Sequence, residues 1–588
     1  MIKRFAQCLR EYKWTALVSP VCMIGEVAME VTIPLVMADL YDYGIAMSNM
    51  TVVWQKALQL LLCALASLLF GCLSADYASK AATGFARNLR HDMYYRVQDF
   101  SFSNIDKFSS ASIVTRLTSD VATIQMAFQM MIRMAIRCPM MLILATVSSL
   151  RISPKLSTVY FIAIPLLALV LLGIIPLVFR IFDRVFKTYD RLNTVVQENV
   201  HGIRVVKSFV RENKEVSKFE AISKAIYDDF CKAEHILAVN APAMQICVYS
   251  CILVISWVGA KMVVASGNNA ALGLTTGELS SMFTYTTQIL SSLMMLSMVF
   301  VMVTMAQAPL RRCYEILTEK PDLTSPENAV RDVPDGSIDF ENVSFRYSQK
   351  AKRPALQDVD LHIPSGSTVG ILGATGSSKS TLVQLIPRLY DATEGSVRVG
   401  GIDVKDYDLE VLRDNVAMVL QKNTLFSGSI KENLRWGNAG ATDEELVHAC
   451  KLACADEFIT GFPDGYDTHI EQGGSNVSGG QKQRLSIARA IAKHPKIYLF
   501  DDSFSALDYK TDVALRRALK AETGDATVII VAQRISTVLH ANQILVLEDG
   551  RIVGKGTHAQ LMESCPAYQE IARSQLSNKE LDLKGGEA

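Results

Sequence analysis

The segment STVGILGATGSSKSTLVQLI (Ser367–Ile386) gives the clearest indication of how the C-terminal half of the chain folds. It is typical of a strand, a glycine-rich loop and a helix. Such a loop presents backbone N–H groups to phosphates, and the positive end of the helix dipole adds to the attraction. Lys379 would neutralise the β- and γ-phosphates of a nucleotide, and Ser380 would hold Mg²⁺. We therefore expect this loop to bind ATP.

One position departs from the usual phosphate-loop pattern G-x-x-x-x-G-K-S/T. Gly373 opens the loop, but Ser378 stands where the second glycine belongs. A side chain at that position would crowd the phosphates and weaken the affinity for ATP. The rest of the loop is intact, with Gly376, Lys379, Ser380 and Thr381.

Two further segments complete a candidate nucleotide site. KIYLFDDS (Lys496–Ser503) is an apolar strand that ends in two carboxylates, and Asp501 would join the Mg²⁺ shell. SNVSGGQKQRLSIARA (Ser475–Ala490) is a helical run opened by Ser478, Gly479 and Gly480, which predicts a second anion site at a helix start. One nucleotide cannot occupy both the phosphate loop and the second anion site of a single chain. The presence of both sites therefore predicts a dimer that closes across the nucleotide.

The composition indicates an apolar part and a polar part joined end to end. The 588 residues are 50% hydrophobic and 20% charged, and the mean hydropathy is +0.21. A formal net charge of zero gives no indication of a nucleic-acid partner. From about residue 336 the sequence alternates between strand and helix patterns, which favours an α/β domain.

The N-terminal part is predicted to be an all-α membrane domain. Crossing about 30 Å of hydrocarbon takes roughly 20 apolar residues in a helix. Six windows qualify: about 15–38, 57–79, 128–150, 156–180, 238–263 and 280–304. The connections 80–125 and 181–236 are too polar for lipid yet helical in pattern. Helices 2 to 5 should therefore extend into the cytoplasm and end in short helices near 112–120 and 198–209 that touch a cytoplasmic domain.

Lysine and arginine counts predict the orientation of this domain. The segment 180–232 holds eleven of these residues and 80–116 holds six, whereas 264–279 holds none. Both termini should therefore be cytoplasmic. The basic residues 1–13 predict an interfacial helix on the inner surface, with Ile2, Phe5, Leu9 and Trp14 towards lipid.

Charged side chains inside the predicted spans need an explanation, since a charge buried in a bilayer is costly. Glu26 and Glu30 share a face of helix 1, and Arg133 and Arg137 share a face of helix 3. They either pair with one another, face water near the inner boundary, or line a translocation cavity. Methionines form a one-face stripe on each of two predicted helices, and such stripes suit either helix packing or an adaptable pocket. One stripe is Met126, Met130 and Met134, and the other is Met294, Met298 and Met302.

In motif order and spacing, the whole chain resembles a half-transporter of the ATP-binding-cassette (ABC) exporter family. GATGSSKS resembles the Walker A loop, VSGGQ (Val477–Gln481) the family signature, LFDD Walker B, and SALD, which ends at Asp508, the D-loop. Tyr347 stands where the family stacks adenine, and Gln421 where it places a glutamine that senses Mg²⁺. The resemblance implies a six-helix type I exporter domain (type IV ABC fold) followed by a P-loop nucleotide-binding domain.

The same resemblance implies a head-to-tail pair of nucleotide domains. Each ATP would be held by the Walker A loop of one subunit and by the signature of the other. In this chain the signature residues would be Ser478, Gly479, Gly480 and Gln481, and the Mg²⁺ residues Ser380, Gln421 and Asp501. Gln472, in THIEQGG (Thr468–Gly474), replaces a usual glutamate of the loop near the opposite coupling helix.

Two catalytic positions depart from the family pattern. The glutamate that polarises the attacking water is replaced by Asp502, and the switch-loop histidine by Gln533, in VIIVAQRIST (Val528–Thr537). A misplaced base loses about 10²–10⁴-fold in rate, so the site should bind ATP and hydrolyse it slowly. This pattern favours the degenerate subunit of a heterodimeric multidrug-type exporter in a bacterial inner membrane, with a different half-transporter as partner. A sluggish homodimer, a lipid or peptide exporter and a non-pumping regulatory or channel subunit are the alternatives.

The expected domain boundaries follow from these segments. They are an interfacial helix 1–13, a transmembrane domain 14–310, a linker 311–335, a nucleotide-binding domain 336–575 and a polar tail 576–588. The expected cargo is a hydrophobic or amphipathic small molecule, and membrane lipid surrounds the first domain.

Overall fold

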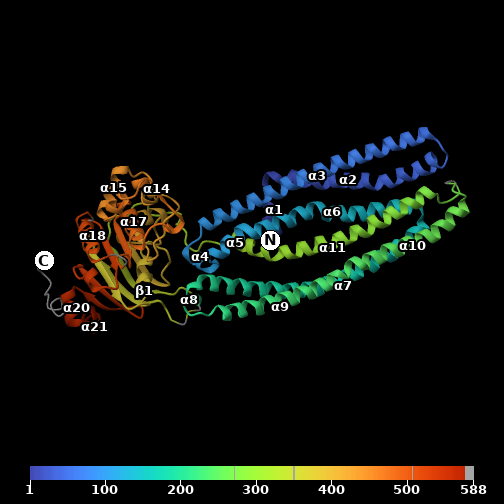
Figure 1. Cartoon of the computed structure of the whole chain (residues 1–588). Helices are drawn as coiled ribbons and strands as arrows, with labels where there is room; N and C mark the ends of the chain where they lie inside the picture. The colour runs from blue at the N-terminus through green and yellow to red at the C-terminus, as the bar shows by residue number, and fades with distance from the viewer. Residues whose placement is uncertain (270–271, 349–350, 352, 506–507, 523, 576–588) are drawn as a thin grey trace. The chain divides into compact units, whose positions relative to one another are not determined.

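The chain divides into two compact units, one all-helical and one α/β (Figure 1). The computed structural model describes residues 1–269, 272–348, 351, 353–505, 508–522 and 524–575. The helical unit comprises Met1–Gln98 and Ser109–Glu319, and the α/β unit comprises Asp99–Phe108 and Lys320–Ala588. The predicted polar tail 576–588 lies outside the described residues.

Within the described residues, six helical stretches of the first unit are long and apolar enough to cross a bilayer. Their main helices are α2 (Lys13–Asp39), α3 (Met50–Gln98), α6 (Val121–Ile152), α7 (Pro154–His201), α10 (Asn240–Ser266) and α11 (Thr276–Thr318). The helix α9 (Glu212–Ala238) precedes α10 almost without a break. Because a span needs only about 20 residues, α3, α7 and α9–α10 extend far beyond it. The predicted six-helix domain with long helical extensions is confirmed.

Short elements join these helices. They are α1 (Ile2–Gln7), η1 (Arg10–Tyr12), η2 (Leu40–Ile45), α4 (Phe102–Phe108), α5 (Ser110–Thr115), η3 (Arg116–Asp120) and α8 (Ile203–Ser208). In Figure 1, α6 and α11 run side by side between the α2–α3 hairpin and the α7, α9 and α10 group. The helices pack as a bundle around a shared apolar core.

Buried tyrosines connect the helices of this core. Tyr160 and Tyr285 are both fully buried. The Tyr160 hydroxyl donates to the carbonyl of Met282 (3.0 Å), and the Tyr285 hydroxyl donates to the carbonyl of Val31 (2.7 Å). These contacts join α7 to α11 and α11 to α2, and they satisfy hydroxyls that could find no water in hydrocarbon.

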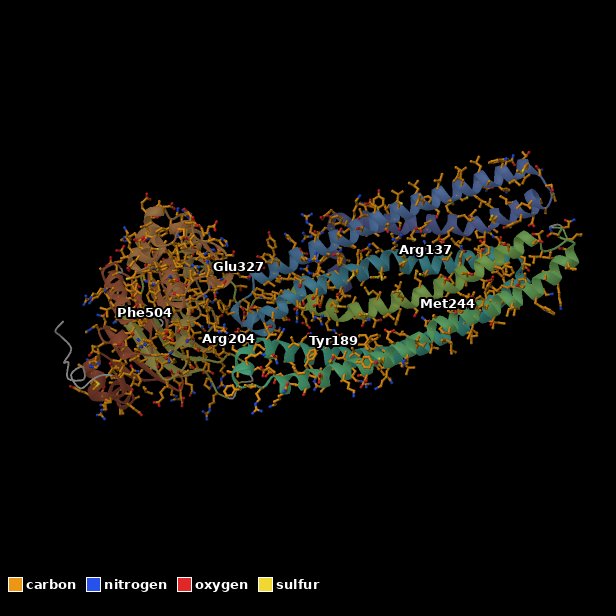
Figure 2. The ribbon with its side chains drawn as sticks, viewed as in Figure 1. Arg137, Tyr189, Arg204, Met244, Glu327 and Phe504 are labelled. Atoms are coloured by element: carbon orange, nitrogen blue, oxygen red, sulfur yellow. The ribbon has the colours of Figure 1, made fainter. Side chains whose placement is uncertain are left out.

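Three of the charged residues of the spans, Glu26, Glu30 and Arg137, form one ion-paired group. The Arg137 guanidinium, labelled on α6 in Figure 2, donates to carboxylate oxygens of Glu26 and, at 2.6 Å, of Glu30 on α2. Gly71 on α3 lies against the Glu26 carboxylate, since a Cβ there would stand 3.3 Å from it. The Arg133 Nε is buried and has no hydrogen-bond partner among the residues that the structure describes. Of the alternatives left open by the sequence, pairing describes Arg137 but not Arg133.

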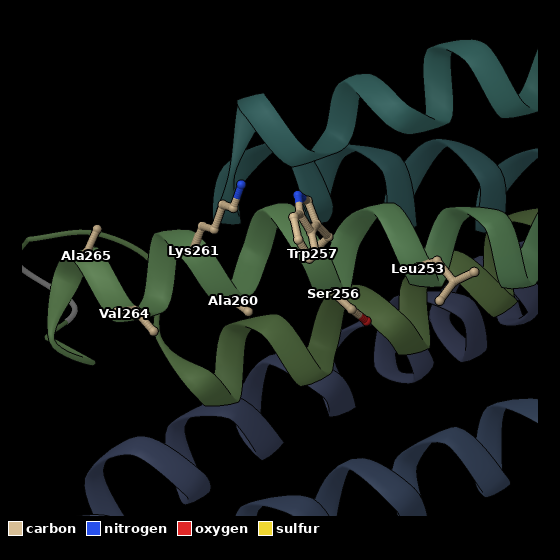
Figure 3. A pocket seen from close by; sticks show the side chains of 7 residues that line it. All are labelled: Leu253, Ser256, Trp257, Ala260, Lys261, Val264 and Ala265. Atoms are coloured by element: carbon tan, nitrogen blue, oxygen red, sulfur yellow. The ribbon is translucent and has the colours of Figure 1, made fainter.

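The outer surface of α10 is apolar. Leu253, Trp257 and Val264 are 70%, 68% and 82% exposed, and the Lys261 ammonium lies 4.5 Å from the centre of the Trp257 ring (Figure 3). These residues line a shallow hollow along the helix. An exposed apolar stripe with tryptophan and lysine towards one end suits a helix that faces acyl chains.

The N-terminal segment corrects one expectation. Phe5 was expected to face lipid, but its side chain is buried at 7% exposure, and its ring lies 6.5 Å from that of Tyr314 on α11. Trp14 is 75% exposed, as expected for a lipid-facing residue. The side chain of Ile2 lies outside the described residues. The helix α1 therefore uses Phe5 to attach to the bundle rather than to the membrane.

The second unit is built on a six-stranded sheet of order β12-β11-β3-β10-β9-β6. The strands are β3 (Thr368–Gly373), β6 (Val416–Val419), β9 (Ile497–Asp501), β10 (Thr527–Val531), β11 (Gln543–Glu548) and β12 (Arg551–Gly556), and all neighbours are parallel except β11 and β12. Val531 of β10 pairs with both Ile371 of β3 and Asp501 of β9. The carboxyl ends of β3 and β9 therefore meet at one edge, where ligands bind in such sheets.

Smaller elements surround this sheet. An antiparallel sheet of order β2-β1-β4-β5 is formed by β1 (Ile338–Phe345), β2 (Leu356–Ile363), β4 (Glu394–Val399) and β5 (Ile402–Asp403), and β7 (Gly428–Ser429) pairs with β8 (His469–Ile470). The helices are α12 (Lys379–Leu385), α13 (Leu409–Asp414), α14 (Ile430–Arg435), α15 (Asp443–Leu452), α16 (Asp456–Thr460), α17 (Gly479–Ile491), α18 (Tyr509–Glu522), α19 (Ile535–Val538), α20 (His558–Ser564) and α21 (Pro566–Gln575), with 3-10 turns at Gly465–Asp467 and Gln472–Gly474.

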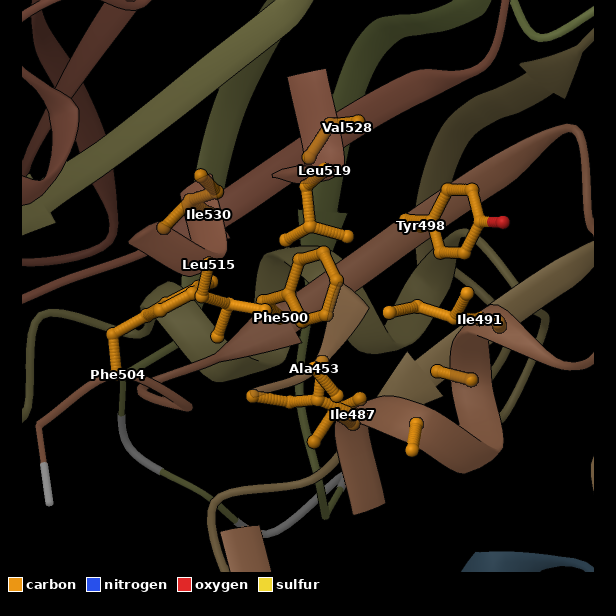
Figure 4. Close-up of a cluster of buried hydrophobic side chains, with 14 of the residues drawn as sticks. Ala453, Ile487, Ile491, Tyr498, Phe500, Phe504, Leu515, Leu519, Val528 and Ile530 are labelled. Carbon is orange, nitrogen blue, oxygen red and sulfur yellow. The ribbon is translucent and has the colours of Figure 1, made fainter. Parts of the chain in front are cut away.

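Both faces of the central strands are buried, as their unbroken apolar sequences predict. Tyr498 and Phe500 of β9 belong to a core cluster with α17 and α18, whereas Ile497 and Leu499 belong to a second cluster on the other face. Figure 4 shows Phe500 among residues of the first cluster, near Leu519 of α18. This burial holds β9, and so Asp501, in a fixed position.

The helix α4 belongs to the α/β unit. Tyr390 donates its hydroxyl to Asp106 (2.8 Å), and Ser103 donates to Asp322 (2.5 Å). Asp99–Phe108 is therefore a part of the first long connection that packs within the α/β unit. Ser112–Asp120, where the sequence predicts this contact, forms part of α5 and η3 in the helical unit.

Candidate nucleotide-binding site

Two glycines of the phosphate loop could not carry a side chain without strain. At one of them neighbouring atoms lie too close, and at the other the backbone has a positive φ. A Cβ on Gly373 would stand 2.3 Å from the carbonyl oxygen of Leu547 and 2.6 Å from the Ser377 hydroxyl. Gly376 has open space around it but a φ of +88°, which a residue with a side chain adopts only with strain. The loop joins β3 to α12, as the sequence predicts.

Ser378 occupies a left-handed conformation. Its φ is +71° and its ψ is +26°, and its side chain makes no capping hydrogen bond to α12. For an L-residue this conformation costs about 1–2 kcal/mol. The sequence pointed to crowding of the phosphates at this position. The structure adds backbone strain, which explains why glycine suits the position.

The next two residues of the loop have the chemistry that a Mg²⁺–nucleotide complex needs. The Lys379 ammonium donates to the carbonyls of Gly373 and Ala374, both at 2.9 Å, so it lies across the loop. Burial lowers the pKa of Lys379. The Ser380 hydroxyl donates to Asp501 at 2.9 Å. Burial also raises the pKa of the Asp501 carboxyl, which is 3% exposed.

The neighbouring oxygens of Ser380 and Asp501 fit Mg²⁺, which prefers hard oxygen ligands. Gln421, the third predicted Mg²⁺ residue, lies beside Asp502 instead, with its Nε2 3.4 Å from Asp502 Oδ2. Mg²⁺ bound here would neutralise phosphate charge.

The structure brings the two departures from the family pattern into contact. The Gln533 Nε2 donates to Asp502 Oδ2 at 2.8 Å, so the same oxygen faces both Gln533 and Gln421. Asp502 follows β9 with a φ of +51°, and its N–H donates to the carbonyl of Val531 (3.0 Å). The Gln483 side chain of α17 reaches the carbonyl of Asp502 (3.4 Å). Asp502 is held by the backbone while two amides approach its carboxylate.

Tyr347 lies beside the phosphate loop. Its hydroxyl is 2.9 Å from the Thr381 hydroxyl, and its ring packs edge-on against Tyr390 with 5.2 Å between centres. Burial raises the pKa of Tyr347, although the residue as a whole is 53% exposed. A partly exposed ring next to α12 provides a surface on which a base can stack.

The signature segment begins α17 with a capping box. The Gln481 N–H donates to the Ser478 hydroxyl (3.3 Å), and the Ser478 N–H donates to the Gln481 side chain (2.9 Å). Gly479 is surrounded by open space, and Gly480 lies in the first turn of the same helix. These polar groups therefore lie at an exposed helix start, where an anion from outside could reach them.

Asp508 caps the start of α18. Its carboxylate accepts from the N–H of Thr511 (3.0 Å) and from the Thr511 hydroxyl (2.7 Å), and these bonds lower the pKa of Asp508. Ala506 and Leu507 of the predicted D-loop lie outside the described residues. The position of Asp508 is therefore set by its own helix.

The helical unit contains a cavity of about 650 Å³ between α7, α10 and α11. Its walls are mostly apolar and include Val178, Phe182 and Met305. Asn240 and Gln307 add polar groups, and the buried Asn240 Oδ1 has no hydrogen-bond partner in the described part of the chain. The size and lining suit an organic molecule of mixed polarity.

Comparison with known proteins decides the family. Models of the ABC transporter transmembrane region and of the ABC transporter match residues 16–294 and 356–505. The uncharacterized ABC transporter ATP-binding protein YfiB of Bacillus subtilis is 36% identical over 571 residues, covering 97% of this chain and 98% of YfiB. The chain belongs to the ABC transporter family. The uncharacterized ABC transporter ATP-binding protein Rv1273c of Mycobacterium tuberculosis is 34% identical over 97% of each chain.

This ABC transporter also shares its fold with a solved structure. A bacterial Atm1-family ABC exporter with ATP bound aligns with a TM-score of 0.81 and 24% identity, covering 97% of this chain and 99% of that one. The transporter is therefore a multi-pass membrane protein with one transmembrane domain fused to one ATP-binding domain. Such a half-transporter works with a second half, which completes the dimer.

Sequence reasoning missed several residues around the site. Tyr390 and Asp106 connect α4 to the neighbourhood of Tyr347, and Gln575 contacts the backbone on both sides of Arg534. None of these residues belongs to a motif. Tyr390 gave a weak sequence signal, since it is an aromatic residue shortly after α12. Asp106 and Gln575 gave none, because contacts between distant segments leave no trace in local spacing.

Proposed function

We propose that this chain is the degenerate subunit of a heterodimeric ABC exporter. It holds ATP and Mg²⁺ at its own Walker A loop and supplies the signature Ser478–Gln481 to ATP bound by a different half-transporter. The observation that carries this proposal is the contact between Asp502 and Gln533. A carboxamide stands where the family uses an imidazole, and it donates to a carboxylate that is one methylene shorter than the usual glutamate.

Three physical arguments support slow hydrolysis at this site. Asp502 Oδ2 faces amide donors from Gln533 and Gln421, so those contacts compete with an attacking water for the same oxygen. A carboxylate about 1 Å short of its working position can lose about 10²-fold in rate. A carboxamide also cannot exchange a proton near neutral pH. Lys379, Ser380 and Asp501, which supply the main phosphate and Mg²⁺ contacts of the proposed site, remain in place for ATP binding.

The cargo is an amphipathic or hydrophobic small molecule moved outward across a bacterial inner membrane. The cavity of about 650 Å³ supports this class, because its apolar walls carry a few polar groups. The methionine stripe of α11 ends one turn before Met305 of the cavity wall. The distribution of lysine and arginine supports cytoplasmic termini and a cytoplasmic nucleotide-binding domain.

Two variants of this chain, each measured in the complex with the partner subunit, test whether this chain supplies the signature while the partner's site hydrolyses ATP. Asp502→Ala should leave the ATP turnover of the complex within about twofold of wild type, whereas Ser478→Ala should lower it at least about tenfold. Ser478→Ala also removes a helix cap, which costs about 0.5–2 kcal/mol of stability. Thr442→Ala is the matched control, because Thr442 caps α15 through the same capping box with Glu445.

Two results would refute the proposal. One is equal loss of turnover in Asp502→Ala and Ser478→Ala. The other is rapid ATP turnover with transport by this chain alone as a homodimer. A complex that binds ATP but moves no fluorescent amphiphile into inside-out vesicles would favour a regulatory or channel subunit, and would overturn the transport part of the proposal.

A further inference from the structure

The last described residue of the chain makes a bidentate contact with the loop that carries Gln533. The Gln575 Nε2 donates to the carbonyl of Gln533 at 2.9 Å, and the Gln575 Oε1 accepts from the N–H of Ile535 at 2.9 Å. Both ends of one side-chain amide therefore hold the backbone on either side of Arg534. We call residues Ala532–Arg534 the switch loop.

The residue at the N-cap position of α19 cannot cap this helix, which explains what the contact with Gln575 contributes. The switch loop leads into α19, a helix of four residues, and its N-cap position is occupied by Arg534, whose side chain makes no capping bond. Arginine has no acceptor with which to cap a helix. The N–H of Ile535, the first residue of α19, would therefore lack a partner. Gln575 supplies the missing acceptor from the far end of the domain.

The helix that carries Gln575 is firmly attached to the domain. Tyr568 and Ala572 of α21 are both fully buried. The Tyr568 hydroxyl lies 2.7 Å from the Nδ1 of His558, which is itself buried in α20. Because α21 is anchored two turns before its end, Gln575 holds the loop from a fixed base rather than moving with it.

The other side of the loop leads to the nucleotide site. The Ala532 N–H donates to the carbonyl of Ile371 on β3 (3.0 Å), and the side chain of Gln533 donates to Asp502. The chain of contacts therefore runs from α21 through the backbone of Gln533 to its side chain. Besides the two bonds of Gln575, the hydrogen bonds of the described switch loop are those of Ala532 and of the Gln533 side chain, and a local bond from the N–H of Thr537 to the carbonyl of Arg534 (3.2 Å).

We propose that Gln575 is a positioning residue that holds the switch loop so that the Gln533 side chain points into the nucleotide site. It acts through Gln533 and does not touch the nucleotide. The C-terminal helix thereby sets how long this site retains ATP. This inference rests on the proposed ATP binding at the Walker A loop, and it adds a residue outside every motif of the family.

The test uses the full chain in lipid nanodiscs and measures two quantities. The first is the dissociation rate of radiolabelled ATP in the presence of Mg²⁺. The second is hydrogen exchange of the amides 533–537 without nucleotide. The variants are Gln575→Ala, Gln533→Ala and the double variant. The control is Gln569→Ala, since Gln569 lies on the same helix and, among the described residues, its side-chain amide bonds only the carbonyl of Met562 (2.7 Å).

Gln575→Ala should release ATP about fivefold faster, which is the effect of losing one or two exposed hydrogen bonds. The same variant should speed exchange of the Ile535 amide, and Gln569→Ala should do neither. In the Gln533→Ala background, Gln575→Ala should add no further increase in ATP release, because the side chain it positions is gone.

Each contrary result has a definite meaning. Unchanged ATP release and unchanged amide exchange in Gln575→Ala would overturn the proposal. An undiminished effect in the Gln533→Ala background, or an equal effect of Gln569→Ala, would show a general loss of packing and would also overturn it. Failure of the wild-type chain to retain ATP would instead refute the proposed nucleotide site, and the exchange measurement would still decide whether Gln575 holds the loop.

Discussion

Replacement of Arg137 by methionine should destabilise the helical unit strongly. Arg137 makes one charged hydrogen bond to Glu26 and another to Glu30, and the three side chains are only 23%, 14% and 33% exposed. Hydrogen bonds to charged groups are worth about 1.5–3 kcal/mol each, and removal of one partner from a buried ion pair costs about 3–5 kcal/mol. The two estimates agree on a loss of about 3–5 kcal/mol, because two carboxylates would remain without a cation.

Thermal unfolding of the purified chain in dodecyl maltoside measures this loss. At about 2–4 °C per kcal/mol for units of 150–250 residues, the midpoint should fall by roughly 10 °C. Arg133→Met is the matched control one turn away, since the Arg133 Nε has no hydrogen-bond partner within the described ranges, and we expect almost no change. The triple variant Glu26→Gln, Glu30→Gln, Arg137→Met should recover most of the loss. Equal shifts for Arg137→Met and Arg133→Met would show that the ion pairs carry no stability and would refute the reasoning.

Two further predictions concern the nucleotide site. Ser378→Gly should strengthen ATP binding several-fold in equilibrium titrations, because it removes both the strain at φ +71°, about 1–2 kcal/mol, and the side chain beside the phosphates; unchanged affinity would show that neither limits binding. The double variant Asp502→Glu, Gln533→His should raise the ATP turnover of this chain's own site by about 10²-fold or more, measured as phosphate release, whereas each single variant should give a smaller gain. A double variant as slow as wild type would show that another feature keeps this site inactive.

The sequence predicted most of the elements, because their signals are local. Long apolar runs identified the six spans, and the glycine pattern around Gly373 identified the strand–loop–helix unit. The pairing of Arg137 with Glu26 and Glu30 remained one of several alternatives, since periodicity shows which residues share a helix face but not which helices meet. The burial of Phe5 was missed for the same reason: an amphipathic segment packs equally well on lipid or on protein.

The positions of site residues that belong to a motif could be predicted from the sequence. Contacts that depend on how the backbone folds could not. Lys379, Ser380 and Asp501 lie together at the sheet edge, as expected from two parallel strands that end there. The direct contact between Asp502 and Gln533 could not be read from two segments about 30 residues apart in the chain. The contact of Gln575 with the switch loop depends on how α21 packs, which no local pattern encodes.

The hydrogen bond between Tyr347 and Thr381 has a consequence for base selectivity. Thr381 belongs to the same short helix as Lys379 and Ser380, so the ring that would support the base is tied to the element that would hold the phosphates. A nucleotide that stacked its base on this ring and placed its phosphates at Lys379 would therefore have to span a distance that depends on this one helix. A substitution that shifts the start of this helix should alter discrimination between purine and pyrimidine triphosphates, even though it lies far from the base.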